Sequence, residues 1–194
     1  GNLDKKRFFN LLSMLQDLQL DFNVPRKDGQ LPLNVALAHG RYQAAKCLIL
    51  GSCGQQKLPN GPVRLKLTDE ELTKNPFLLT LIDSLEKSLG AYASRKDENG
   101  KLYTVPHNER YLKLHYLVLA RYLVYQGAAT EYPQELKLPD PQEHASKKGF
   151  EKIAQLIGYA RDKKMDATLD LVGQEISETT QYFVKEGIEP YRLI

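Results

Sequence analysis

One stretch, Asp28–Cys53, constrains the fold of this chain more than any other; it reads DGQLPLNVALAHGRYQAAKCLILGSC. Asp28-Gly29 is typical of a turn, because glycine adopts positive φ without steric cost. Pro32 fits the first turn of a helix, where its missing N–H would have no partner in any case. The helix is expected to end at Gly40, since glycine is favoured just beyond a helix C-terminus.

A second short helix is predicted directly after this one, from Tyr42 to about Leu50, and it ends at Gly51-Ser52. The apolar residues available for burial on the two helices are Leu33, Val35, Ala36, Leu37, Ala44, Ala45, Leu48 and Ile49. Two helices of this length cannot bury their own apolar faces in water. The unit must therefore stack on neighbours of the same kind.

The same residues resemble an ankyrin repeat, a 33-residue unit with the signature TPLHxA. Here the signature reads Leu31-Pro32-Leu33-Asn34-Val35-Ala36, and Cys47-Leu48-Ile49 takes the place of the family's leucine run. Leu31 replaces the family's Thr, and Asn34 replaces its His. The resemblance implies stacked helix pairs that bind another protein through the turn tips and the exposed side of each first helix.

A second copy of the pattern occurs further along the chain, in residues 139–149. Three positions match without gaps: Pro141 with Pro32, Ala145 with Ala36, and Gly149 with Gly40. The copies are 109 residues apart, which is three 33-residue periods and a remainder of about ten residues. The Gly/Pro-rich segment 51–67, expected to be a surface loop or insertion, accounts for the remainder. Four units, two of them eroded, then fit between residues 23 and 161.

The rest of the chain also has helical patterns. Leucines at three- and four-residue steps predict an N-terminal helix at Leu3–Leu20. Thr68 and Glu71 have the Ser/Thr-x-x-Glu spacing of a capping box, so a helix start is predicted there. Further helices are expected at 77–92, at 108–126 and after Lys164. The helix at 108–126 is apolar on nearly every side and should lie in the middle of the protein. The predicted fold is an all-α, ankyrin-like helical repeat solenoid. One array spans 1–194, with an N-terminal helix (1–22), degenerate repeats (23–161) and a C-terminal capping helix (162–194).

Charge and cysteine content narrow the classes of partner. The net charge is +3, which does not favour nucleic acid, and no apolar run approaches the ~20 residues of a membrane span. We therefore expect a monomer that binds neither nucleic acid nor the membrane interior.

Cys47 lies in an apolar helix and is interpreted as a small buried hydrophobe. This favours a reducing compartment, the cytoplasm.

The search for catalytic chemistry finds little. A cysteine nucleophile needs an activated thiolate with a base in reach, and nothing in the local sequence ties Cys53 to any of the four histidines: His39, His107, His115 and His144. A zinc site needs four ligands in close pairs, whereas the two cysteines lie six residues apart. The sequence therefore predicts no catalytic residue, no metal and no cofactor.

The predicted function is binding to a partner protein. Transferring the family's binding positions onto the two copies gives Arg26, Lys27, Gln30, Asn34 and His39 in the first, and Lys137, Asp140, Glu143 and His144 in the second. Degenerate arrays of this style are similar to those of effector proteins from intracellular bacteria, which act in the host cytosol. Two alternatives are a recruiting domain of a larger enzyme, and an enzyme that depends on Cys53.

Overall fold

The computed structural model of this chain describes residues 21–53, 56–58, 60–93, 95–96, 102–103 and 106–187. The expected helix Leu3–Leu20 and the chain beyond residue 187 lie outside these residues. Helices make up most of the described chain, so the all-α prediction is confirmed. None of these helices is long and apolar enough to cross a membrane.

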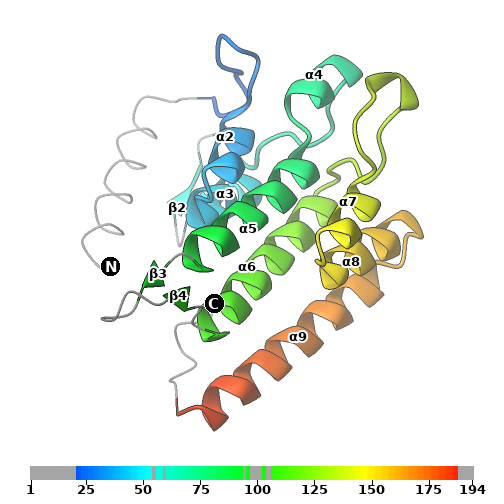
Figure 1. The fold of residues 1–194 in the computed structure, drawn as a ribbon. Helices are drawn as coiled ribbons and strands as arrows, with labels where there is room; N and C mark the ends of the chain where they lie inside the picture. Colours follow the sequence, from blue (N-terminus) through cyan, green and yellow to red (C-terminus); the bar gives the residue numbers. More distant parts are fainter. Residues whose placement is uncertain are drawn as a thin grey trace.

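Most of the helices follow one another in pairs (Figure 1). The first pair is α2 (Pro32–Ala38) with α3 (Tyr42–Leu50), and the second is α5 (Phe77–Ala93) with α6 (Pro106–Tyr125). The third is α7 (Pro141–Lys147) with α8 (Glu151–Arg161), after which comes α9 (Met165–Lys185). Two short elements, α4 (Asp69–Lys74) and the 3₁₀ helix η1 (Gln134–Leu136), lie in the connections. The described residues thus contain three such pairs between 32 and 161, where we expected four units.

The three pairs lie side by side in two rows. The first members form one row, in which α5 contacts both α2 and α7. The second members form the other row, in which α6 contacts both α3 and α8. The last helix, α9, packs across α6 and α8. Because α6 touches α3, α5, α8 and α9, its prediction as the central helix is confirmed.

Proline and glycine set the limits of the short helices, as the sequence indicated. Pro32 and Pro141 each occupy the first turn of a helix. Gly40 and Gly149, which follow α2 and α7, have φ of +61° and +75°. A side chain is disfavoured at such angles, so glycine allows the chain to reverse into the second helix of each pair.

The core lies between the two rows. Most of the apolar residues expected to be buried in the first copy are buried: Leu33, Ala36, Leu37, Ala45, Leu48 and Ile49. Val35 and Ala44 are half-buried. In the second copy, Ala145, Ile153 and Leu156 are buried. Leu117, Leu119 and Leu123 of α6 are at most 2% exposed. Because α6 has neighbouring helices on nearly every side, its apolar residues are buried on nearly every side as well.

Segment 51–67 is not the plain surface loop that we expected. It contains a small antiparallel hairpin of β1 (Ser52–Cys53) and β2 (Gln56–Lys57), and three of its apolar side chains, Leu58, Val63 and Leu65, are buried in the core. The Val63 N–H donates to the Leu48 carbonyl at 2.9 Å, which ties the segment to the end of α3. A second hairpin pairs β3 (Arg95–Lys96) with β4 (Leu102–Tyr103). Strands of two residues are too short to give an alternating sequence pattern.

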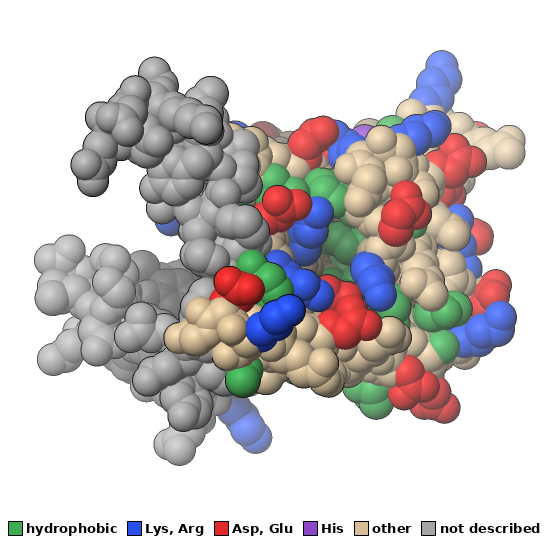
Figure 2. Space-filling view, turned by 60° about the horizontal axis from the view of Figure 1, so that its bottom comes forward, with side chains coloured by type: hydrophobic (Ala, Val, Ile, Leu, Met, Phe, Trp, Pro, Cys, Tyr) green, Lys and Arg blue, Asp and Glu red, His purple; other side chains and the backbone are tan. Residues whose placement is uncertain are grey.

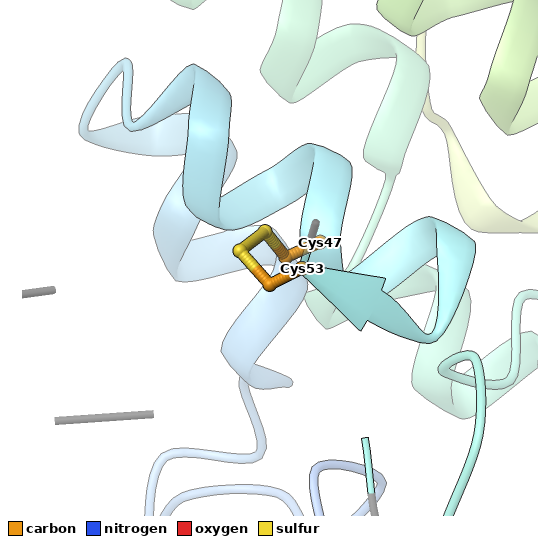
Figure 3. The surroundings of a disulfide bond; sticks show 2 residues. All are labelled: Cys47 and Cys53. Carbon is orange, nitrogen blue, oxygen red and sulfur yellow. A yellow bond between two sulfur atoms is a disulfide. The ribbon is translucent and has the colours of Figure 1, made fainter. Parts of the chain in front are cut away.

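The two cysteines are joined by a disulfide bond (Figure 3). It links Cys47 of α3 to Cys53 of β1, with their Cα atoms 4.8 Å apart, and both residues are buried. Cys47 is therefore buried, as interpreted, but it is not a free thiol. Cys53, whose thiol the enzyme alternative requires, is not free either. Because disulfides persist mainly in oxidising compartments, the bond argues slightly against the reducing compartment that we expected.

Candidate partner-binding surface

Three loops extend from the same end of the helix rows, each directly before the first helix of a pair (Figure 1). We call them the first loop (residues 21–31), the second loop (60–76, which contains α4) and the third loop (126–140, which contains η1). Each runs into α2, α5 or α7, respectively. The sequence placed candidate binding residues on the first and third of these loops.

The first loop is held by a tight turn and by one residue of the second loop. The Gln30 N–H donates to the Asp28 side chain at 3.0 Å, and the Gly29 N–H to the Arg26 carbonyl at 2.8 Å. Asn75 is completely buried; its Oδ1 accepts from the Leu31 N–H at 2.7 Å and its Nδ2 donates to the Gly29 carbonyl at 3.1 Å. Buried polar groups are stable only when their hydrogen bonds are made, so Asn75 fixes the base of the first loop.

The second loop is ordered by a capping box at the start of α4. The Glu71 N–H donates to the Thr68 hydroxyl, and the Thr68 N–H donates back to the Glu71 carboxylate, as the sequence predicted. Hydrogen bonds from Arg64, and then from the Thr68 backbone, lower the pKa of Glu71 to about 2. The Arg64 N–H also donates to the Asn23 side chain at 2.6 Å, and this contact ties the second loop to the first.

The third loop is held by Arg161 of α8. Its guanidinium donates to the Thr130 carbonyl, to the Gln142 side chain at 3.0 Å and to the Asp140 carboxylate at 2.5 Å. Asp140 also accepts from the Glu143 N–H at 2.9 Å and so caps α7. Partial burial alone would raise the pKa of Asp140, but the hydrogen bonds from the Glu143 backbone and from Arg161 outweigh it and lower the pKa.

A tyrosine of the third loop reaches the start of α5. The Tyr132 hydroxyl is hydrogen-bonded to the backbone of Leu79, and burial raises the pKa of this phenol. Leu79 lies in the first turn of α5, where backbone N–H groups have no partner inside the helix. The three loops are therefore linked to one another and to the helix ends by side-chain hydrogen bonds.

The loop tips, in contrast, are exposed. Arg26 and Asp28 form an ion pair at 3.5 Å with side chains 59% and 49% exposed, and Lys27 beside them is exposed. Val24 is an apolar residue of the same loop and is 60% exposed. The exposed charged residues of the second and third loops are Arg64, Lys66, Asp69, Glu70, Lys74, Glu131, Glu135 and Lys137. The surface is thus made of exposed tips on fixed bases.

Of the residues that the sequence proposed, Arg26, Lys27 and Gln30 come together in one turn. Lys137 is exposed on the third loop, whereas Asp140 is half-buried and engaged by Arg161. Glu143 is exposed on α7, where it pairs with Lys147 at 3.3 Å. These residues therefore fall into two groups, one on the first loop and one where the third loop meets α7.

Two other proposed residues do not fit this surface. Asn34 is buried at 4% exposure; it accepts from the Thr80 hydroxyl at 2.8 Å and donates to the Lys74 carbonyl at 3.2 Å. Its prediction as an exposed contact is wrong, because its side chain joins α2 to α5. His39 is exposed but lies at the far end of α2, away from the loops.

The last proposed residue, His144, belongs to a polar seam between α5 and α7. Its Nε2 lies 2.7 Å from a carboxylate oxygen of Asp83. Lys148, at the end of α7, forms ion pairs with Glu86 and, at 3.4 Å, with Asp83. The hydrogen bond with Glu86 is the main cause of a raised Lys148 pKa. The seam holds α7 to α5 and leaves its acidic side chains 58% exposed.

Sequence reasoning missed the residues that anchor the loops. Asn75 precedes Pro76, and an Asn-Pro dipeptide is a turn signal that could have marked it. Arg161 carries no such signal, because its partners Thr130 and Asp140 lie 31 and 21 residues away. Val24 was likewise read only as part of a connection.

The described residues offer no support for catalysis at a cysteine or a metal. Cys53 is bonded to Cys47, so in this state it has no thiol to ionise. Among the residues described, no cluster of three or more His, Cys, Asp or Glu is arranged to hold a metal ion.

Comparison with known proteins adds no assignment: no family model, curated protein or solved structure matches this chain.

Proposed function

We propose that this protein binds another protein through the tips of its three loops and the adjoining exposed faces of α2, α5 and α7. One observation carries the proposal. The three loops extend from one end of the helix rows, with bases fixed by buried or half-buried Asn75 and Arg161 and tips that are exposed.

Fixed loops favour binding because less conformational freedom is lost when the complex forms. The tip of the first loop also has suitable side chains. Arg26 is of a type enriched among the residues that dominate binding energies, and Val24 is an exposed apolar neighbour in the same loop. Acidic Asp69 and Glu70 on the second loop supply charge of the opposite sign. A partner with both acidic and basic contacts would match this arrangement.

The order of elements supports the ankyrin-like part of the proposal. Each pair consists of a loop, a first helix, a connection and a second helix. The connection is a short turn in the first and third pairs and contains the β3–β4 hairpin in the second. The two rows keep first helices beside first helices. We infer a short stack of three divergent units, with α9 packed across the second helices of the last two. Its role is recognition, and no step of the proposal involves catalysis by this chain.

The test is capture of partners by variants of the loop tip. A variant Arg26→Ala/Lys27→Ala/Gln30→Ala removes two cations and one amide from the first loop. The matched control, Arg41→Ala/Gln181→Ala/Lys185→Ala, removes the same groups from exposed sites elsewhere: the turn after α2 and the last turns of α9. Each protein is immobilised and incubated with lysate of its source cells, and the bound proteins are quantified by mass spectrometry.

We expect at least one protein that is retained by the parent and the control but lost by the loop variant. With that protein purified, the loop variant should bind at least about fivefold more weakly, which corresponds to 1 kcal/mol. Equal capture by the two triple variants would mean that the loops are not the binding surface.

A further inference from the structure

A groove on the opposite row has features that the proposed function does not use. It lies between α3, α6 and α9 and encloses about 190 Å³, far more than a single water molecule requires. The loop tips and the first helices α2, α5 and α7 contribute none of its lining residues. The groove is therefore separate from the proposed partner-binding surface.

The charge of the groove is positive and unbalanced. Lys46 of α3 and Arg121 of α6 line it, and no aspartate or glutamate does. Both cations are half-buried, and neither forms an ion pair with any residue in the described part of the chain. Within that same part, the buried Nε of Arg121 has no hydrogen-bond acceptor. Cations that are partly removed from water without a counter-charge favour an anionic ligand.

Two tyrosines add hydrogen-bond donors beside the cations. Tyr42 of α3 and Tyr122 of α6 both line the groove. Burial, assisted by the neighbouring Tyr122 and Tyr111, raises the pKa of Tyr42. Its hydroxyl therefore stays protonated at neutral pH and can donate a hydrogen bond to an anion.

The α9 side of the groove is aliphatic. Leu169, Val172 and Ile176 line it, together with Val118 of α6. Leu169 is 53% exposed, so apolar surface remains uncovered at this edge. The groove thus combines two cations and phenolic donors on the α3–α6 side with a purely aliphatic α9 side. This division suits a ligand with an anionic head and an apolar body.

A second hollow in the protein lacks this imbalance. It is lined by Leu85, Leu117 and Phe150, and Figure 2 shows hydrophobic side chains between acidic and basic ones on the face that it opens to. Its two lysines are each paired: Lys113 with Glu109 at 2.7 Å and Lys152 with Glu175 at 3.6 Å. An anion would have to compete there with a carboxylate that is already present.

We propose that the groove between α3, α6 and α9 binds a medium-chain aliphatic monocarboxylate. The carboxylate lies between Lys46 and Arg121, within reach of the Tyr42 hydroxyl, and the hydrocarbon chain lies on Leu169, Val172 and Ile176. Each half of the ligand meets a matching half of the groove.

The test is titration calorimetry of the whole chain with three probes that each carry a ten-carbon chain: decanoate, decanol and decyltrimethylammonium. Decanol is used below its solubility limit, and the two ionic probes below their micelle concentrations. We expect decanoate to bind with one-to-one stoichiometry and at least tenfold more tightly than either of the others. Equal affinity for decanol or for the cationic probe would overturn the proposal, and so would the absence of decanoate binding up to millimolar concentration.

A matched pair of variants locates the site. Lys46→Gln/Arg121→Gln should weaken decanoate binding at least tenfold, whereas Lys113→Gln/Lys152→Gln, which removes the same charge from the second hollow, should change it less than twofold. If the first variant fails to fold, Leu169→Asp, at an exposed position on the edge of the groove, takes its place with the same expectation. Equal weakening by the groove variant and the control variant would show that binding does not use this groove.

Discussion

The first and third helix pairs share one sequence pattern but are held in different ways. Pro32, Ala36 and Gly40 of the first pair correspond to Pro141, Ala145 and Gly149 of the third. The two segments form the same arrangement of a short first helix, a turn and a second helix. The pairs differ at the N-caps of their first helices, α2 and α7. Leu31 has no capping side chain, and its N–H is bonded to Asn75, 44 residues away. Asp140 at the equivalent position caps its own helix.

The second helices differ as well. Cys47 of α3 is bonded to Cys53, whereas the equivalent residue of α8 is Leu156, which is completely buried. The comparison teaches that the apolar, proline and glycine positions define the pair, and that each pair has its own means of fixing its ends. Mutations can separate these two contributions.

The largest effect is expected where the two pairs are alike. Leu48→Ala in α3 and Ile157→Ala in α8 each remove a buried aliphatic side chain at equivalent positions. Each should lower the free energy of unfolding by ~2–5 kcal/mol, because the lost contacts leave a cavity. Denaturant unfolding monitored by circular dichroism measures the change, with the exposed Leu169→Ala as a control expected to cost less than ~0.5 kcal/mol. A cost below about 1 kcal/mol at either buried site would show that the pairs are not equivalent.

The next largest effect is expected at the N-caps of the first helices, where the two pairs should lose different amounts of stability. Asn75→Ala leaves the buried Leu31 N–H and Gly29 carbonyl without their partner and should cost about 3 kcal/mol. Asp140→Ala removes the side chain that caps α7 and should lower the free energy of unfolding by about 1–2 kcal/mol. The same unfolding measurement compares the two variants. If Asn75→Ala is no more costly than Asp140→Ala, the first pair does not depend on its distant anchor.

The disulfide should stabilise the first pair alone. Replacing both Cys47 and Cys53 by alanine should lower the free energy of unfolding by about 2 kcal/mol, since the bond closes only a short loop. A reducing agent should lower the melting temperature of the parent and leave that of the double variant unchanged. If the reducing agent leaves the melting temperature of the parent unchanged, the bond has no stabilising role.

The smallest difference between the two pairs is expected at their turn glycines. Alanine at Gly40 or Gly149 has to adopt positive φ, which costs ~1–2 kcal/mol at either site. A Cβ at Gly40 would also lie 3.3 Å from the Tyr116 hydroxyl and 3.4 Å from the Ser88 hydroxyl, whereas nothing lies within 4 Å at Gly149. The Tyr116 hydroxyl is held by Ser84 at 3.0 Å and has little room to move.

We therefore expect Gly40→Ala to cost ~1 kcal/mol more than Gly149→Ala, through overpacking. Thermal melts of the two variants, recorded side by side, measure this difference. Equal melting temperatures would mean that the space around Tyr116 relaxes without cost.

The sequence predicted what depends on local spacing. Pro32 and Gly40 mark the ends of α2 because backbone geometry favours those residue types there whatever the neighbours are. The Thr68 capping box was predicted for the same reason, since both of its partners lie within one helical turn. The central place of α6 followed from its own composition, which leaves no polar face for water.

The sequence did not predict contacts between distant residues. Asn34 occupies a position where the family pattern suggests an exposed polar residue, but α5 covers it and Thr80 satisfies it. Asn75 and Arg161 act on residues tens of positions away, and helical periodicity contains no information about such partners. The same limit explains the cysteines: their bond depends on the hairpin that returns Cys53 to α3, and strands of two residues left no pattern.

The contacts of Asn75 have a consequence for how this surface can diverge. Within the first loop its carboxamide bonds only backbone atoms, the Leu31 N–H and the Gly29 carbonyl; its other bond goes to the Glu71 carbonyl of α4. The identity of the residues at positions 24, 26 and 27 is therefore irrelevant to the anchor. Substitutions at the tip can therefore change its side chains while Asn75 keeps the loop backbone in the same place. A library randomised at these three positions should consist mostly of folded members, each displaying a different chemistry in the same place.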